Sequence, residues 1–486
     1  MARTKRGRAA AVKPQDTYEH PLATRYASAE MIRLWSSQTR CTTWRKIWVA
    51  AALAQRELGL PIKAGQIRAM TNAIEDIDFK AAARYERRLR HDVMAHIHAF
   101  ADAAPSARPI IHLGMTSMDV VDNADLMLMR QAFELLERRL VGVIRSLARF
   151  CEQYADLPAL GFTHLQPAQL TTLGKRGTLW LNDLVGDLRN WSKTRRGLLC
   201  RGLRGATGTQ ASFLKLLGTA ARVQKMERIF ARQLDFKKCY PVTGQTYSRK
   251  VDLEVLTVLG TFAAGVHKIC NDLRLLSMLK AIDEPFENKQ VGSSSMPYKR
   301  NPMRAERATG LARFLMSLVT SAYNTLAAQM LERTLDDSSN KRLVMPQAFL
   351  TADALAMLLQ NIFDGLVVYP ASLATHIRAE LPFIASEDIL MAGVAAGGDR
   401  QDLHERIRQH SQAAGEQVKT HGRPNDLIER LKADEAFAGI KWQRVLDPQR
   451  YIGLAPQQTR EFLRRVVAPV LRKYERTKPP QADLHV

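Results

Sequence analysis

The stretch from Asp125 to Tyr154 reads DLMLMRQAFELLERRLVGVIRSLARFCEQY, and it decides the fold class. Its apolar side chains recur at alternating spacings of three and four residues, which makes a heptad stripe that continues over four repeats. A helix of about 30 residues is about 45 Å long at 1.5 Å per residue, which exceeds a typical globular helix. The stretch therefore predicts a long helix in a bundle or at a subunit interface. The apolar positions of the stripe are Leu126, Met129, Phe133, Leu136, Leu140, Val143, Leu147, Phe150 and Tyr154.

A second stripe of this kind runs from Val255 to Leu276. Further long helices are expected around residues 173–199, 311–330 and 349–366, whereas segments with strand-like alternation are few and short. The chain is therefore predicted to be all-α.

Turn signals divide the helices outside this region into shorter pieces, as at Gly59-Leu60-Pro61 and Gly422-Arg423-Pro424. This pattern predicts three helical domains, with the long-helix bundle in the centre. Residues 1–13 carry five basic and no acidic residues and lack the apolar core of a secretory signal, so a disordered basic arm is expected there. The expected boundaries are 1–17 for the arm, then 18–115, 116–368 and 369–486 for the three domains.

Composition is that of an ordinary folded protein, with 46% hydrophobic and 24% charged residues among 486. No uninterrupted apolar run reaches the ~18 residues that span a bilayer, so no membrane association is expected. The five cysteines are scattered and include no C-x-x-C pair. This favours free thiols in a reducing compartment, with the cytoplasm as the default.

The net charge of +23 admits two interpretations, a nucleic-acid binder or an enzyme for a polyanionic small molecule. The basic residues are spread along the whole chain, and no zinc-finger, RNP or basic-zipper pattern occurs. The spread disfavours nucleic acid as a partner, but composition alone leaves the choice open.

Three loops dense in polar residues, glycine and proline precede long helices, at 112–117, 161–175 and 292–307. Loops on rigid scaffolds are where functional groups concentrate. In the third loop, Asn301-Pro302 is expected to be an N-cap followed by proline at the first helical position. A solvated serine-rich linker is the alternative interpretation of the same residues.

Histidines give two different signals. His164 is held in the second loop among hydrogen-bonding residues rather than on an apolar helix face, which favours a functional role. His91, His96 and His98 are spaced by five and two residues, which does not bring all three to one helix face, so no metal site is predicted.

The segment Gly292–Pro302, GSSSMPYKRNP, resembles the G-S-S-x-M-P-x-K-x-N-P signature of the fumarase/aspartase superfamily, and Thr163–Pro167 (THLQP) resembles a second motif of that superfamily. Within it, the chain is most similar to the adenylosuccinate lyases, in particular the branch that includes the animal enzymes. The resemblance extends from about residue 18 to the C-terminal region. The segments that carry it further are 88–96, 111–117, 161–176, 208–213, 244–247 and 332–338.

The resemblance implies an all-α, three-domain fold whose central helices assemble into the 20-helix core of a homotetramer, with each active site built from three subunits. It implies β-elimination of fumarate from adenylosuccinate, giving AMP, and from SAICAR, giving AICAR. Neither a cofactor nor a metal is expected.

The family motifs assign roles to individual residues. Ser293 is the expected base and His164 the acid, while Lys299 and Asn301 stabilise the carbanion intermediate. Glu306 is expected to orient the catalytic histidine, and His91 is the second histidine of the site. Ser293 is chosen over Ser294 and Ser295 because it directly follows the motif glycine.

A substrate with a phosphate and two carboxylates needs several cations and hydrogen-bond donors. Ser295, Ala305 and Lys341 depart from residues that are usual in close relatives, which puts fine tuning in doubt. The expected substrate-binding residues are Arg25, Tyr26, Arg90, His91, Asp92, Thr116, Ser117, Gln245, Lys299, Asn301, Arg307, Arg333, Ser338 and Arg342.

Two rival hypotheses remain. Another lyase of the superfamily, such as argininosuccinate lyase or fumarase, would keep the Gly292–Pro302 loop without the phosphate-binding arginines. A non-catalytic scaffold or basic nucleic-acid-binding protein on this fold is the rival from a different class.

Overall fold

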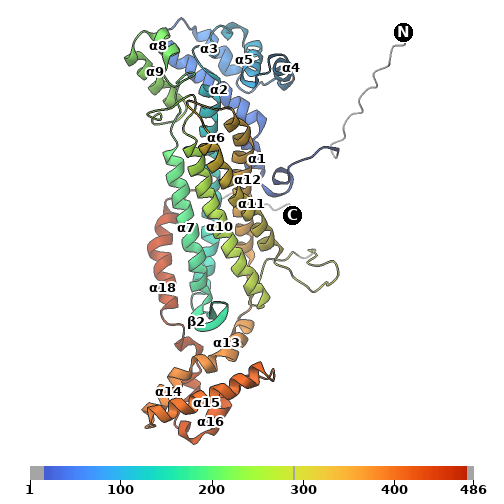
Figure 1. Ribbon diagram of the computed structural model, residues 1–486, viewed down its shortest axis with the longest axis vertical. Coiled ribbons are helices and arrows are strands. Elements are labelled where there is room, and N and C mark those ends of the chain that lie inside the picture. The colour runs from blue at the N-terminus through green and yellow to red at the C-terminus, as the bar shows by residue number, and fades with distance from the viewer. Residues whose placement is uncertain (1–15, 288–289, 479–486) are drawn as a thin grey trace, which may run out of the picture.

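The computed structural model describes residues 16–287 and 290–478, and it shows an elongated, almost entirely helical molecule (Figure 1). The all-α prediction is confirmed. Of the predicted basic arm, residues 1–15 lie outside the described residues.

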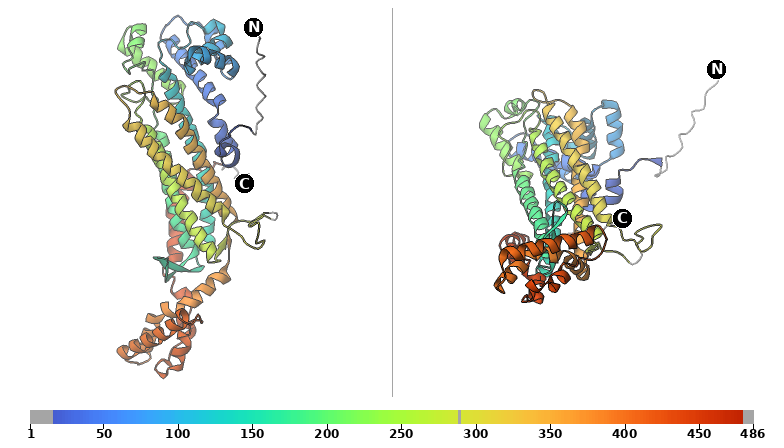
Figure 2. Two further views of the ribbon diagram at one scale, coloured as in Figure 1. Left: turned by 45° about the vertical axis from the view of Figure 1, so that its right-hand side comes forward. Right: turned by 60° about the horizontal axis from the view of Figure 1, so that its bottom comes forward.

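A bundle of long helices forms the middle of the molecule and runs along its longest axis (Figures 1 and 2). The first of them begins eight residues before Asp125, the start of the quoted stretch, and spans 37 residues, about 55 Å at 1.5 Å per residue. The bundle helices are α6 (Ser117–Gln153), α7 (Leu173–Gly197), α10 (Lys250–Met278), α11 (Met303–Ala327) and α12 (Asp336–Gly365).

The heptad stripe of α6 is buried as its spacing predicts. Leu126, Met129 and Phe133 are fully buried, and the stripe stays buried as far as Phe150. Trp180 and Trp191 on α7 and Phe262 on α10 pack into the same core. Burial of these apolar side chains is the main contribution to the stability of the bundle.

Helices α10 and α12 are long and apolar enough to cross a membrane by length and composition. Within the molecule, 56% and 78% of their most apolar windows are buried. Such burial is typical of the core helices of a soluble protein.

Shorter helices surround the upper end of the bundle (Figure 1). Two of them, α8 and α9, come from a connection between α7 and α10 and lie beside the N-terminal helices. The elements at this end are α2 (Ser37–Glu57), α3 (Ala64–Asn72), α4 (Phe79–Leu89), α5 (Asp92–Ala103), η3 (Pro105–Ala107), α8 (Ala211–Leu217) and α9 (Ala220–Gln233). The preceding η2 (Leu22–Tyr26) and α1 (Ala29–Leu34) lie against the side of the bundle, next to α12 (Figure 1).

The lower end has a hydrophobic core of its own, which includes Ile389, Leu403, Leu427 and Phe437. The chain then returns to the bundle, where α18 lies beside α7 and Val467 joins the main core (Figure 1). The elements are α13 (Pro370–Ile384), α14 (Ser386–Ala395), α15 (Arg400–Lys419), α16 (Leu427–Ala433), η4 (Glu435–Phe437), α17 (Trp442–Val445), η5 (Pro448–Arg450), α18 (Ala455–Phe462), η6 (Leu463–Val467) and α19 (Ala468–Arg472).

The described strands form two small antiparallel pairs. Strands β1 (Pro158–Thr163) and β2 (Gln166–Thr172) make a hairpin between α6 and α7, and Thr163 pairs with Gln166 at its tip. Strands β3 (Ile282–Asp283) and β4 (Val367–Val368) pair where the chain leaves α10 and α12. The hairpin fixes the position of the loop that carries His164.

Candidate active site

Nine of the predicted substrate-binding residues line one cavity of about 580 Å³ near the upper end of the bundle. They come from four places in the chain: the α4–α5 junction, the start of α6, the segment before α10 and the start of α12. Long-range folding therefore brings these nine predicted residues together within one chain. The nine are Arg90, His91, Asp92, Thr116, Ser117, Gln245, Arg333, Ser338 and Arg342.

The junction between α4 and α5 presents Arg90 and His91 to the cavity. Arg90 ends α4 with a φ of 55°, in the left-handed region that non-glycine residues seldom adopt. His91 caps α5, with its Nδ1 accepting a 3.4 Å hydrogen bond from the backbone N–H of Met94. Its Nε2 lies 3.4 Å from the Oγ of Ser117. The cap thus orients the imidazole across the cavity toward the start of α6.

The loop that carries Thr116 and Ser117 is anchored from α2. The indole N–H of Trp48 donates to Nδ1 of His112 over 3.0 Å, and Nε2 of Gln55 donates to the carbonyl of Leu113 over 2.8 Å. Burial lowers the pKa of His112 to about 4, so its ring is neutral at neutral pH and can accept the Trp48 hydrogen bond. Thr116 then starts α6 with a capping box to Asp119.

Two arginines face the cavity from the start of α12. Nη1 of Arg333 donates to Oε1 of Gln245 over 3.0 Å, and its Nη2 donates to the Oγ of Ser338 over 2.5 Å. Nη2 of Arg342 forms a 3.0 Å ion pair with Asp92. These contacts place cationic and hydroxyl donors together, as an anionic ligand requires.

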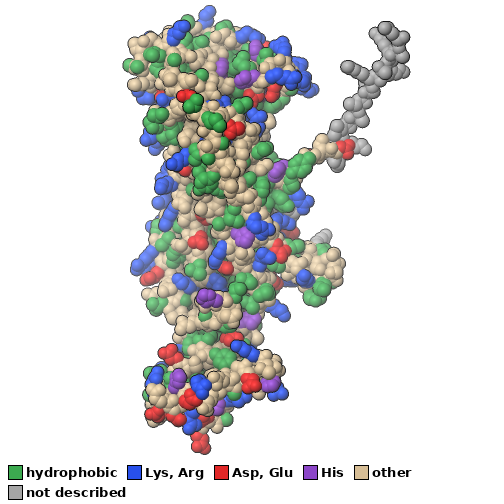
Figure 3. All heavy atoms as spheres, viewed as in Figure 1, with side chains coloured by type: hydrophobic (Ala, Val, Ile, Leu, Met, Phe, Trp, Pro, Cys, Tyr) green, Lys and Arg blue, Asp and Glu red, His purple; other side chains and the backbone are tan. Residues whose placement is uncertain are grey.

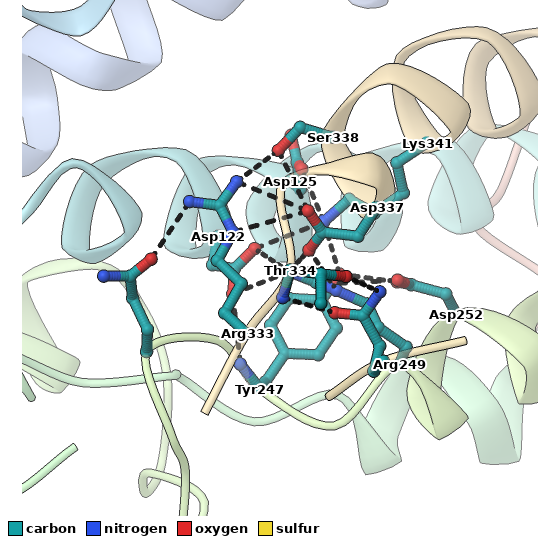
Figure 4. A network of polar contacts seen from close by, with 12 residues as sticks. Asp122, Asp125, Tyr247, Arg249, Asp252, Arg333, Thr334, Asp337, Ser338 and Lys341 are labelled. Atoms are coloured by element: carbon teal, nitrogen blue, oxygen red, sulfur yellow. Dashed lines mark hydrogen bonds and ion pairs between the residues drawn. The ribbon is translucent and has the colours of Figure 1, made fainter. Parts of the chain in front are cut away.

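Behind the cavity lies a buried ionic network that the sequence interpretation missed (Figure 4). Asp122 accepts from Arg249 over 2.9 Å and from Lys341 over 3.2 Å. Asp337 joins Arg249 to Arg333. The network therefore ties α6 and the start of α10 to the cavity wall.

The heptad pattern contained a signal for this network. Asp119 and Asp122 continue the stripe of Leu126 and Met129 toward the start of α6, so they stand at core positions. Carboxylates at such positions must be paired, because an isolated buried charge is costly. Asp119 is indeed paired with the fully buried Arg201.

His164 lies elsewhere, at the tip of the β1–β2 hairpin near the lower end of the bundle (Figure 1). It is exposed and has a φ of 54°, and the following Leu165 is 74% exposed. The hairpin projects the histidine away from its own chain.

The Gly292–Pro302 segment forms a projecting loop between β3 and α11 (Figure 1). The side-chain amide of Asn301 donates to the carbonyl of Gly292 over 2.8 Å, which closes the base of the loop. A Cβ on Gly292 would lie 2.3 Å from the carbonyl oxygen of Lys299, so this close approach requires glycine. The Oγ of Ser293 accepts a 3.1 Å hydrogen bond from the backbone N–H of Met296.

The prediction that Asn301 caps α11 is wrong. Pro302 is the capping residue, and α11 begins at Met303 without a local side-chain cap. Glu284 supplies the missing acceptor, because its carboxylate accepts from the backbone N–H groups of Arg304 (2.9 Å) and Ala305 (2.7 Å). Because Glu284 caps the helix, the side chain of Asn301 can instead bond to Gly292 and close the loop.

The remaining predicted residues lie outside the cavity. Arg25 and Tyr26 are in η2, while Glu306 and Arg307 are in the first turns of α11. Within one chain, the described lining of the cavity includes neither these four residues nor any predicted residue of the two loops. Within one chain, the predicted residues therefore lie in four separate places: the cavity, the β1–β2 hairpin, the Gly292–Pro302 loop with the first turns of α11, and η2.

Over residues 16–287 and 290–478, no cluster of three or more His, Cys, Asp or Glu side chains could hold a metal ion. His96 instead lies 3.6 Å from the Sγ of Cys41, and burial lowers its pKa to about 4. His98 stacks on the ring of Tyr85.

Comparison with known proteins gives concordant matches. A family model described as Lyase matches residues 25–316, more than half of the chain, and a model described as Adenylosuccinate lyase C-terminus matches residues 382–462. The adenylosuccinate lyase of Saccharomyces cerevisiae is 49% identical over 95% of this chain and 97% of its own length. That of Schistosoma mansoni is 45% identical over 95% and 97%. The crystal structure of a fumarate lyase from Mesorhizobium sp. BNC1 superposes with a TM-score of 0.77 at 22% identity, covering 91% of this chain and 99% of that one.

The fold and these matches define a lyase with the all-α architecture of the fumarase/aspartase superfamily, as predicted. The site adds a cavity lined by arginines, hydroxyls and a histidine. Within the superfamily, the chain belongs to the adenylosuccinate lyase family.

Proposed function

We propose that this chain eliminates fumarate from adenylosuccinate, giving AMP, and from SAICAR, giving AICAR. One observation carries the proposal: Arg333, Ser338 and Arg342 meet the Thr116–Ser117 pair in one cavity. Such a cavity suits a ligand with a phosphate at one end and carboxylates at the other.

In the proposed reaction, Ser293 removes a proton from the carbon β to the leaving nitrogen. The C–N bond then breaks, and His164 protonates the departing nitrogen. A serine is a weak base, so its deprotonated form needs stabilisation. The hydrogen bond from the Met296 N–H to the Ser293 Oγ supplies part of it, since donors to an oxygen favour its charged form.

Charge develops on the substrate carboxylate when the proton leaves. Lys299 and Asn301, on the same loop as Ser293, are proposed to stabilise it. Glu306 is proposed to orient the catalytic histidine, and His91 to contact the substrate. Arg25, Tyr26 and Arg307 complete the proposed binding set. All these steps are assigned to protein side chains, and no cofactor is proposed.

We further propose a homotetramer in which each site draws these groups from three subunits. The predicted site residues lie in separate places within one chain, and His164 projects outward. Large apolar side chains are also exposed on the bundle surface: Leu179 on α7 (55% exposed), Met278 on α10 (70%) and Tyr323 on α11 (56%). Exposed apolar surface of this kind is typical of a subunit interface. Light scattering is expected to give the mass of four 54.6-kDa chains, and a monomer with full activity would contradict the shared site.

The location proposed for the enzyme is the cytoplasm. All five cysteines are free, and four of them are buried. Free thiols are typical of a reducing compartment.

The decisive test is a paired assay of fumarate release from adenylosuccinate and from argininosuccinate. Activity on adenylosuccinate alone is expected, and activity on argininosuccinate alone would overturn the assignment.

Nucleic-acid binding is the other rival hypothesis. On the face shown in Figure 3, Lys and Arg side chains are spread over the length of the molecule, interspersed with acidic ones, rather than confined to one region. Nucleic-acid binding that survives at physiological salt after deletion of residues 1–13 would favour it.

A further inference from the structure

Asp337 occupies an unusual place, because its carboxylate joins a buried arginine to two residues of the cavity (Figure 4). The Asp337 side chain is fully buried in the first turn of α12. Its Oδ2 accepts from Nε of Arg249 over 2.9 Å. Its Oδ1 accepts from Nε of Arg333 (3.4 Å), Nη2 of Arg333 (3.3 Å) and the Oγ of Ser338 (3.2 Å).

Arg249 is itself held from several sides. Its guanidinium donates to Asp122 on α6 over 2.9 Å and to Asp252 over 3.4 Å, and it lies over the ring of Tyr247 at 4.5 Å. Burial alone would raise the pKa of Asp122, but the charges of Arg249 and Lys341 outweigh it and hold that pKa below its usual range. Asp122 is therefore ionised at neutral pH, and Arg249 presents a fixed positive charge to Asp337.

The consequence is that Arg333 has little freedom. Its Nε and Nη2 face Asp337, its Nη1 faces Gln245, and its side chain is 14% exposed. An arginine that must be ordered when ligand arrives loses side-chain entropy, whereas one already held loses less. The buried network thus prepares the guanidinium before a ligand binds.

We propose that Asp337 is a positioning residue: backed by Arg249, it holds Arg333 and Ser338 in the orientation that receives the phosphate of the nucleotide. The proposal rests on the proposed function, because that function supplies the phosphate. Asp337 itself is buried and acts only through the residues that it holds.

The test compares binding of AMP and adenosine, which differ by the phosphate, to the full-length wild-type enzyme and the Asp337→Asn variant by calorimetry. Asparagine keeps the shape and removes the charge. AMP binding is expected to weaken about 10- to 100-fold, whereas adenosine binding changes less than about threefold. An unchanged ratio of AMP to adenosine affinity in a folded variant overturns the proposal.

Glu137→Gln is the matched control. Glu137 is a buried carboxylate on α6, 4% exposed and 2.8 Å from Arg195, outside the described lining of the cavity. It is expected to reduce stability and leave the AMP-to-adenosine ratio unchanged. A similar fall in that ratio for Glu137→Gln would show a general structural effect and overturn the specific role of Asp337.

A double-mutant cycle tests whether Asp337 acts through Arg333. In an Arg333→Ala background, Asp337→Asn is expected to cause little further loss of AMP affinity, and full additivity overturns the proposal. If Asp337→Asn does not fold, Arg249→Lys replaces it and is expected to cause a smaller loss in the same direction. Binding by the wild type distinguishes failure of the proposed function from failure of this inference. If the wild type does not bind AMP more tightly than adenosine, both fail. If the wild type prefers AMP and Asp337→Asn keeps the same preference, only this inference fails.

Discussion

The cavity at the upper end of the bundle and the two projecting segments with His164 and Ser293 differ in how the chain holds them. The cavity residues are fixed by helix caps, by anchors from α2 and by a buried ionic network. His164 is exposed at a hairpin tip, and the Ser293 loop is closed mainly by contacts within itself.

This difference separates two tasks. One chain by itself builds the cavity of proposed binding groups, where fixed geometry lowers the entropy cost of binding. The groups proposed for proton transfer lie on segments that face outward. Substitutions in the outward segments are therefore expected to have the largest effects, and those around the cavity smaller ones.

The first prediction concerns the two outward segments. Ser293→Ala and His164→Ala are each expected to lower kcat about 10²- to 10⁴-fold, because each removes a proposed proton-transfer group. If the two groups of one site come from different subunits, mixing and reassembling the two variants restores about a quarter of the sites. The measurement is fumarate release before and after mixing.

A matched control for this mixing uses two defects on one loop. Ser293 and Lys299 belong to the same segment, so every loop in a mixture of Ser293→Ala and Lys299→Ala carries one defect. No recovery is expected for that pair. Recovery with the control pair, or none with the Ser293 and His164 pair, would contradict a site shared in this way.

The sequence predicted the buried helices of the bundle better than it predicted the projecting hairpin and loop. The stripe of Leu126 and Met129 predicted α6, because burial of one helix face imposes a period that is visible in the sequence. The hairpin around His164 was predicted only as a loop, because β1 and β2 are short and pair with each other rather than with a larger sheet. The domain boundaries near 115 and 368 remain predictions.

Contacts between distant residues account for what the sequence missed in the site. The cap of α11 depends on Glu284, which lies about 20 residues before the helix amides that it accepts from, and no local pattern reports it. Asp119 and Asp122 were visible as charges at core positions, but their partners Arg201 and Arg249 were not. Family motifs supplied the proposed roles of Ser293 and His164, which the fold of one chain does not display.

The second prediction tests whether the Ser293 loop depends on its own closure. Gly292→Ala is expected to lower kcat about 10- to 100-fold, because the new Cβ meets the Lys299 carbonyl and displaces the base of the loop. The melting temperature is expected to stay nearly constant, since the loop lies outside the core. Gly310→Ala on α11 is the control, because open space surrounds the position of its Cβ. A Gly292→Ala enzyme with normal kcat would show that loop geometry does not limit the reaction.

The third prediction moves to the cavity. Arg342→Ala is expected to raise KM for adenylosuccinate about tenfold and to change kcat less than about threefold, because a binding cation is lost while proton transfer is unaffected. Arg342→Lys keeps the charge but loses the forked geometry, so an intermediate KM is expected. Steady-state kinetics of both variants provide the measurement. A fall in kcat with unchanged KM would place Arg342 in the chemical step instead.

The fourth prediction has the smallest expected effect and concerns the anchor of the Thr116–Ser117 loop. His112 has a folded-state pKa of about 4, below the ordinary value of 6.5, because burial disfavours its charged form. The unfolded chain therefore binds a proton first as the pH falls. The stability that depends on neutral His112 is fully present above pH 6.5 and is lost as the pH falls toward 4.

His112→Asn should reduce this loss of stability. Asparagine tolerates the φ of 66° at this position and offers a carbonyl oxygen to the indole N–H of Trp48, so the anchor can persist in acid. Between pH 6.5 and 4.5, urea unfolding of the variant is expected to show about 1–2 kcal/mol less destabilisation than the wild type. His404→Asn alters an exposed histidine on α15 and should leave the pH dependence unchanged. If His112→Asn loses as much stability in acid as the wild type does, the anchor of the Thr116–Ser117 loop does not depend on a neutral His112.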